Sequence, residues 1–281
     1  MEWVLLRVAV APTRAEPLAD FLLAEGAPAV VRETESTAQG RVIVEAHVPA
    51  VTHARVAAAL AGYLARTGEA VVESAPLTDV DWEAVFRRHH HPVLVGRRLA
   101  VAPPWEVPDA GGREVIVIEP GQAFGTGQHA TTRMCLEEIE AAVTAGGVVS
   151  ALDVGTGSGL LAAALARLGV PRVVALDVDP DVLPRARANL DRNGARQVRL
   201  VCGRADACRR RFDLVVANLL ADALVQDAAA LAAATAEQGS LVVSGLLDTQ
   251  VERVSAAFPA WRTLGVRAED RWRTLTLARA E

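Results

Sequence analysis

The sequence of 281 residues contains no lysine, so arginine supplies all 29 of its basic side chains. Alanine is abundant as well, and the two features together indicate the base composition of a GC-rich genome rather than a function. Cysteine is scarce: Cys135, Cys202 and Cys208 are widely spaced and form no CxxC pair. We therefore expect no disulfide framework and no structural zinc site, and the three thiols suit a reducing cytoplasm.

Long apolar runs are also lacking. None approaches the ~20 residues that a membrane-spanning helix needs. The N-terminal run MEWVLLRVAV has an acid at position 2 and Arg7 among its apolar residues, unlike a secretory signal. These features predict a cytoplasmic protein without a membrane partner.

Net positive charge is missing as well. The formal net charge is −5, with a pI of about 5.8, whereas nucleic-acid-binding proteins usually carry a basic face. We therefore expect no direct nucleic-acid partner. Six arginines and ten acidic residues fall within residues 1–80, so the first third of the chain is suited to attract a basic partner.

Residues 1–78 predict a small α+β domain. Strand-like runs WVLLRVAVAP, AVVRETE, RVIVEAHVP and EAVVESAPL are interrupted by two amphipathic segments, TRAEPLADFLLAEG and THARVAAALAGYLARTG. The resulting order, β-α-β-β-α-β, is that of a ferredoxin-like domain, a fold that often serves for binding.

Residues 79–92, DVDWEAVFRRHHHP, predict a linker helix that ends before the proline. Three adjacent histidines, His89 to His91, fall in this segment. Neighbouring side chains on a helix point about 100° apart and do not converge on one ion. A metal site is therefore not expected.

Residues 93–281 predict a doubly wound α/β domain. Continuously apolar strands such as VVSALDVG, RVVALDVDP and FDLVVANLL alternate with helical segments, as in a parallel sheet that is covered on both faces. One of these segments, residues 221–239, predicts a helix that is followed by a strand at 240–247. Two final strand-like runs, WRTLGVRAED and RWRTLTLAR, predict a terminal antiparallel hairpin.

Two glycine-rich loops lie close together in this domain. The first, residues 118–132, reads IEPGQAFGTGQHATT, and the second, residues 153–159, reads DVGTGSG. The second follows a strand and precedes a helix, and Asp177 ends the next strand, where an acid meets ribose hydroxyls in many nucleotide-binding sheets. Its GxGxG spacing differs from the GxGxxG fingerprint, which disfavours a dehydrogenase that uses NAD.

The run LDVGTGSG, with Asp153 ahead of the glycines, resembles class I S-adenosylmethionine-dependent methyltransferases. In that class the acid–glycine loop serves the methionine end of the cofactor, and the acid after the second strand, here Asp177, holds the ribose. The acid after the third strand, here Asp206, faces the adenine. Asn218 ends the fourth strand, but ANLLADAL lacks the Pro-Pro-aromatic sequence that follows this residue in many amine methyltransferases.

The runs VIEPGQAFGTGQHATT, LDVGTGSG, LDVDP and ANLLADAL resemble the ribosomal protein L11 methyltransferase family, PrmA, and the likeness spans nearly the whole chain. The resemblance implies cofactor contacts that include the following residues: Thr132, Asp153, Gly155, Gly157, Asp177, Asp206 and Asn218. It places Phe124 and Thr126 near the methyl acceptor. Asn218 is the candidate for orienting the acceptor amine, and His129 either accepts its proton or braces the first loop.

The resemblance implies a monomeric protein N-methyltransferase that transfers methyl groups from S-adenosylmethionine to lysine or α-amino groups of ribosomal protein L11. On this reading, residues 1–78 recognise the substrate. Two alternatives stay open at the level of sequence. In the first, the acceptor is another protein or a small amine. In the second, the chain binds S-adenosylmethionine without catalysis.

Overall fold

The computed structural model describes residues 3–27, 29–33, 41–67, 71–77, 91–119 and 127–280. It divides the chain into two compact units, Met1–His89 and His90–Glu281. The linker helix expected at 79–92 lies outside the described residues except for its last two positions. Phe124 and Thr126 of the first glycine loop lie outside them too.

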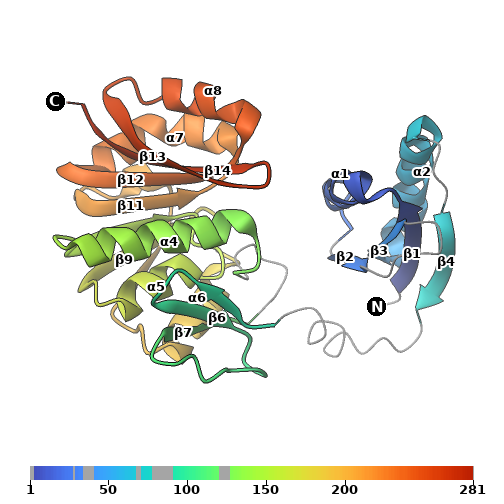
Figure 1. Ribbon diagram of the computed structural model, residues 1–281, viewed down its shortest axis with the longest axis horizontal. Helices are drawn as coiled ribbons and strands as arrows, with labels where there is room; N and C mark the ends of the chain where they lie inside the picture. The colour runs from blue at the N-terminus through green and yellow to red at the C-terminus, as the bar shows by residue number, and fades with distance from the viewer. Residues whose placement is uncertain are drawn as a thin grey trace. The chain divides into compact units, whose positions relative to one another are not determined.

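The first unit is a four-stranded sheet with two helices (Figure 1). Its elements are β1 (Trp3–Val10), α1 (Pro12–Ala24), β2 (Ala29–Glu33), β3 (Val42–Pro49), α2 (Ala50–Thr67) and β4 (Val71–Leu77). The strands pair antiparallel in the order β2-β3-β1-β4. The element order is the one that the sequence predicts. Side chains of α1, α2, β1 and β3 form its core, with Leu6, Leu18 and Leu60 fully buried.

The second unit contains a small sheet and a large one. The small sheet consists of β5 (Val93–Val95), β6 (Leu99–Ala102) and β7 (Glu114–Val117). The remaining elements are α4 (Ala130–Ala145), β8 (Ser150–Val154), α5 (Leu160–Arg167), β9 (Arg172–Asp177), α6 (Leu183–Arg192), β10 (Arg199–Cys202), η1 (Ala205–Ala207), β11 (Phe212–Asn218), α7 (Ala221–Ala234), β12 (Thr235–Leu247), η2 (Asp248–Gln250), α8 (Val251–Ala256), β13 (Trp261–Glu269) and β14 (Trp272–Arg279).

The large sheet has the strand order β10-β9-β8-β11-β12-β14-β13. The first five strands are parallel, and β14 pairs antiparallel with both β12 and β13. The doubly wound sheet and its terminal hairpin are therefore confirmed. The order of the strands reverses between β8 and β11, and in such sheets ligands bind at this switch point, beyond the carboxyl ends of the strands.

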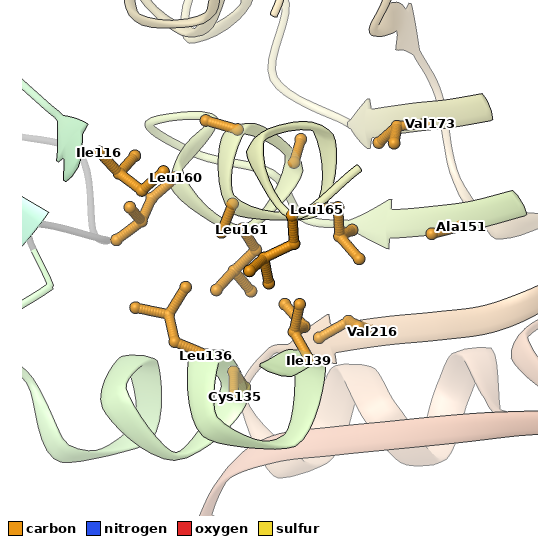
Figure 2. Packing of buried hydrophobic residues seen from close by; sticks show 14 of the residues in the cluster. Ile116, Cys135, Leu136, Ile139, Ala151, Leu160, Leu161, Leu165, Val173 and Val216 are labelled. Carbon is orange, nitrogen blue, oxygen red and sulfur yellow. The ribbon is translucent and has the colours of Figure 1, made fainter. Parts of the chain in front are cut away.

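Two apolar layers cover the large sheet. Alternate residues of β11 face opposite sides: Leu214 and Val216 pack with α4, α5 and α6, whereas Val215 and Ala217 pack with α7 and α8. Figure 2 shows the first layer, in which Leu136 and Ile139 of α4 point toward Leu161 and Leu165 of α5. Burial of both faces accounts for the continuously apolar strands in the sequence.

The boundary between α7 and β12 differs from the prediction. The helix ends at Ala234 instead of Gly239, and β12 begins at Thr235. Thr235 pairs with Phe212 of β11, and its Oγ1 donates a hydrogen bond to the Leu231 carbonyl oxygen at 2.8 Å. The alanine-rich segment favours a helix locally, but pairing with β11 overrides that preference.

Candidate functional site

Polar side chains gather at the carboxyl ends of four neighbouring strands. Asp153 lies near the end of β8, Asp177 ends β9, Asp206 follows β10, and Asn218 ends β11. Because these strands are parallel and adjacent, their carboxyl ends share one edge of the sheet. The fold therefore brings together at one edge the four polar residues that the sequence singled out on different strands.

The second glycine loop is held against β9. The backbone N–H groups of Gly155 and Thr156 both donate to the Leu176 carbonyl oxygen, at 2.9 and 2.8 Å. The Asp177 carboxylate accepts the N–H of Gly157 at 2.9 Å. Gly155 has φ +73°, and a Cβ added there would lie 2.3 Å from Cδ2 of Leu219. Glycine suits this position because of its positive φ and because a side chain would collide with Leu219.

Asp153 is fully buried at the base of this loop. Its Oδ2 accepts hydrogen bonds from Thr156 Oγ1 at 2.7 Å and from the Ala162 N–H at 3.1 Å. Its Oδ1 is buried and has no hydrogen-bond partner among the described residues. Burial raises the pKa of Asp153 to about 7, with a further increase from the charge of Asp177 and an opposing effect of the two hydrogen bonds. A buried acceptor without a partner is costly, and a donor or cation from a ligand would satisfy it.

Asn218, Thr131 and His129 form a chain of hydrogen bonds. Asn218 Nδ2 lies 3.3 Å from Thr131 Oγ1, which lies 2.7 Å from His129 Nδ1. The Thr131 N–H also donates to His129 Nδ1, at 3.3 Å, so that His129 caps α4. Since Nδ1 accepts, the neutral tautomer with its proton on Nε2 fits this geometry. The chain connects the end of the first glycine loop to the end of β11.

Buried polar groups on the neighbouring strands support this chain. Thr131 and Thr132 are both buried in the first turn of α4. Ser244 Oγ lies 3.4 Å from the Thr131 carbonyl oxygen and 2.6 Å from Thr274 Oγ1. The His129 ring contacts Trp272 edge-on, with centroids 4.9 Å apart. The start of α4 is thus held by β12 and β14 as well as by β11.

A family profile described as ribosomal protein L11 methyltransferase (PrmA) matches residues 2–280 of the chain. The chain belongs to this family. A ribosomal protein L11 methyltransferase of Pelotomaculum thermopropionicum is 38% identical over 287 aligned residues, which cover 92% of each protein. One from Pseudomonas aeruginosa is 36% identical and covers 96% of this chain and 95% of its own. The crystal structure of a ribosomal protein L11 methylase from Lactobacillus delbrueckii subsp. bulgaricus has a TM-score of 0.64 at 31% identity and covers 68% of this chain and all of its own.

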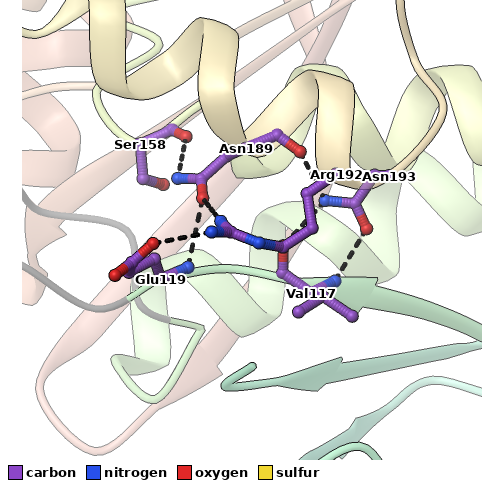
Figure 3. A network of polar contacts seen from close by, with 6 residues as sticks. All are labelled: Val117, Glu119, Ser158, Asn189, Arg192 and Asn193. Carbon is purple, nitrogen blue, oxygen red and sulfur yellow. Dashed lines mark hydrogen bonds and ion pairs between the residues drawn. The ribbon is translucent and has the colours of Figure 1, made fainter. Parts of the chain in front are cut away.

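Asn189 is a residue of this PrmA-family chain that the sequence analysis did not single out (Figure 3). It is fully buried in α6, and its Nδ2 donates to the Ser158 carbonyl oxygen at 2.9 Å. Its Oδ1 accepts the Glu119 N–H at 3.1 Å and Arg192 Nη1 at 2.9 Å. Asn189 therefore binds both glycine loops through one amide.

Asn193, one turn further along the chain, binds the backbone of β7 through its side-chain amide. Its Oδ1 accepts the Val117 N–H at 2.7 Å, and its Nδ2 donates to the Val117 carbonyl oxygen at 2.7 Å. Two buried amides four residues apart share one face of the helix. In the run ARANLDRNG, that spacing is the one sequence signal that marks these residues.

The described part of the PrmA-family chain contains no group of three or more histidine, cysteine or acidic side chains arranged to hold a metal ion. His91 has its Nδ1 3.0 Å from Oε2 of Glu106, and its two neighbouring histidines lie outside the described residues. Nor does any helix in the described ranges have the length and apolarity to span a bilayer.

Proposed function

We propose that this chain transfers methyl groups from S-adenosylmethionine to lysine or α-amino groups of ribosomal protein L11. Family membership across residues 2–280 supports the reaction class and the substrate. The observation that carries the proposal for the site is that Asn218 and the second glycine loop lie together at the switch point of the sheet.

The residues at the switch point fit the cofactor. Asp153 Oδ1, which is buried and unpartnered among the described residues, suits the cofactor's cationic amino group. Gly155 and Gly157 both have the positive φ of a tight ligand-binding turn, and Asp177 suits ribose hydroxyls. Thr132, Asp206 and Asn218 complete the proposed contacts. When bound, S-adenosylmethionine supplies an activated methyl group.

The acceptor amine must be neutral and correctly oriented. A lysine with a free pKa of ~10.4 loses its proton at pH 7 at a cost of about 4.6 kcal/mol, and removal from water lowers this cost. Asn218 donates from Nδ2 to Thr131, while its Oδ1 accepts no hydrogen bond among the described residues. We infer that Oδ1 accepts an N–H of the amine and thereby directs its lone pair.

Of the two roles open to His129, the hydrogen bonds favour the brace. A general base needs an unprotonated nitrogen that faces the acceptor. Here Nδ1 accepts from Thr131, and the proton of the neutral ring belongs on Nε2. The same contact caps α4 and fixes the end of the first glycine loop. Phe124 and Thr126 of that loop stay proposed contacts of the acceptor.

The acidic first unit is proposed to recognise the basic substrate protein. Residues 1–80 carry ten acidic residues against six arginines, and charge of this sign attracts a cationic partner. The proposed site of action is the cytoplasm, where the substrate is made.

Intact-mass spectrometry tests the proposed function. Purified, unmethylated ribosomal protein L11 is incubated with S-adenosylmethionine and either the wild-type protein or its Asn218→Ala variant. Mass gains in steps of one methylene with the wild type, and much slower gains with the variant, are the expected result. A variant with unchanged turnover and cofactor affinity would contradict the role of Asn218.

The same experiment separates the alternatives. If L11 gains no mass while calorimetry shows that the cofactor binds, the chain acts on another acceptor or binds the cofactor without catalysis. Adding small amines and other ribosomal proteins to parallel reactions distinguishes those two cases.

A further inference from the structure

A cavity lies at the end of the large sheet opposite to the proposed cofactor site. Its volume is about 420 Å³, within the ~300–1,000 Å³ range of small-molecule pockets. Ser150, Arg172, Arg199 and Phe212 line it, and they are the first residues of β8, β9, β10 and β11. Because these strands are parallel, their amino ends lie a full strand length away from Asn218 and the glycine loops.

Arginine dominates the rim of this cavity. Arg172, Arg199, Arg210 and Arg211 all line it, and all four are exposed. Among the described residues, the side chains of the first three make no hydrogen bond or ion pair. Arg211 contacts Glu237 at 3.4 Å, but both side chains are more than half exposed, and such pairs contribute little. We call these four residues the arginine pocket.

Asp213 follows the pocket residue Phe212 in the chain but does not line the cavity, and its carboxylate is already engaged. Asp213 Oδ2 accepts the Val149 N–H at 3.0 Å, and the Ser150 N–H and hydroxyl, both at 2.8 Å. Asp213 therefore holds the starts of β8 and β11 together instead of pairing with an arginine. The pocket keeps a local positive charge, although the whole chain carries −5.

The spacing of the arginines indicates the kind of anion. They extend from β10 across β9 and β8 to β11, and three inter-strand spacings amount to about 14 Å. Successive phosphates of a nucleic-acid strand can contact guanidinium groups that start from strands this far apart, each at its own arginine. Arginine binds phosphate oxygens through two parallel hydrogen bonds. Apolar side chains at Pro171 and Val174 offer a surface for a sugar or base.

In contrast to the expectation from net charge that there is no direct nucleic-acid partner, we propose that the arginine pocket binds the phosphate backbone of RNA. The choice of RNA as the strand rests on the proposed function, because ribosomal proteins assemble on RNA. The cofactor site lies at the other end of the same strands, so RNA and cofactor can be bound together. The pocket then holds the enzyme near RNA that carries or awaits the substrate protein.

Fluorescence anisotropy with a labelled single-stranded RNA tests this proposal. The wild type is compared with the double variant Arg172→Glu/Arg210→Glu and with Arg14→Glu/Arg262→Glu. The second variant makes the same change of charge at exposed arginines outside the pocket. We expect the pocket variant to bind RNA at least tenfold more weakly and the control variant within about twofold of the wild type. The salt dependence of the pocket variant should be shallower by about 1–2 in log–log slope.

Three measurements make the result decisive. Unchanged cofactor affinity in both variants shows that each is folded. Equal loss of RNA binding in both variants means that net charge alone is responsible, and it overturns the proposal. If AMP or inorganic phosphate binds through Arg172 and Arg210 while RNA does not, the ligand is a single phosphate and the RNA proposal is wrong. Because no methyl transfer is measured, failure here leaves the proposed methyltransferase activity untouched.

Discussion

Asn189 connects the two glycine loops: its Oδ1 accepts the N–H of Glu119 at 3.1 Å, and its Nδ2 donates to the carbonyl oxygen of Ser158 at 2.9 Å. Glu119 belongs to the first loop and Ser158 to the second. The side chain is fully buried, so water cannot replace these bonds. One amide therefore links the two loops directly.

We expect Asn189→Ala to weaken cofactor binding as well as stability. The change removes the hydrogen bonds that Asn189 makes to the backbone of Ser158 and Glu119, and the loss of a buried hydrogen-bond partner costs about 1–3 kcal/mol. Calorimetry should show at least a tenfold loss of affinity for S-adenosylmethionine. Asn193→Ala is the matched control, since it loses bonds to Val117 but does not contact Ser158. Equal losses of cofactor affinity in the two variants would show that Asn189 has only a structural role.

Asp153→Asn should remove part of the pH dependence of stability. The pKa of Asp153 is raised to about 7, so the folded state favours the protonated acid. Stability from this group is fully present below its unfolded pKa of ~3.9 and is lost as the pH rises through 7. The variant resembles the protonated form at every pH. Without cofactor, it should therefore be more stable than the wild type at pH 8, by a few kcal/mol, and nearly equal at pH 4.

Thermal unfolding of both proteins across this pH range measures the effect. Cofactor affinity should change in the opposite direction, because the variant lacks the carboxylate that we assign to the cofactor's amino group. A gap in stability that stays constant from pH 4 to pH 8 would contradict the raised pKa.

Thr131→Val should lower turnover with little loss of fold. Valine has nearly the same shape, but it removes the hydroxyl that lies between Asn218 and His129. A misplaced catalytic group can cost about 10²-fold in rate, so we expect kcat to fall by roughly tenfold to a hundredfold. Thr131→Ser keeps the hydroxyl and should retain most of the activity. If serine and valine lower kcat equally, retention of the hydroxyl does not preserve turnover, and the role that we assign to the hydroxyl is wrong.

Gly155→Ala and Gly245→Ala should impair different properties of the protein, cofactor affinity in the first and thermal stability in the second. A Cβ at Gly245 would lie 2.2 Å from the backbone oxygen of Leu219, whereas at Gly155 it meets a side-chain end of the same leucine at 2.3 Å. Both glycines have positive φ, which costs other residues roughly 1–2 kcal/mol, but only the side chain can move aside. Gly245→Ala should therefore lose more thermal stability, and Gly155→Ala, which displaces Leu219 beside the proposed cofactor site, relatively more cofactor affinity. A thermal shift of equal size in both would refute this distinction.

Local signals in the sequence were sufficient to predict the strands of the large sheet and its terminal hairpin. Apolar strands and glycine loops mark their own ends, because hydrophobic periodicity and backbone conformation are properties of short segments. The same signals predicted Asp153, Asp177 and Asn218 as residues at strand ends. They failed at Thr235, where an alanine-rich segment favours a helix and pairing with β11 decides otherwise.

The sequence by itself determined the order of the elements, the class of fold and the strand ends at which the proposed cofactor residues lie. Only the tertiary structure decided which groups meet. It brings Asn189 to the backbone of Ser158 and Thr131 to Asn218. It also gathers Arg172, Arg199 and Arg210 around one cavity. A net charge of −5 gave no sign of that cavity. The physical reason is that a sheet places side by side strands that are distant in the chain, and no local pattern records which strands become neighbours.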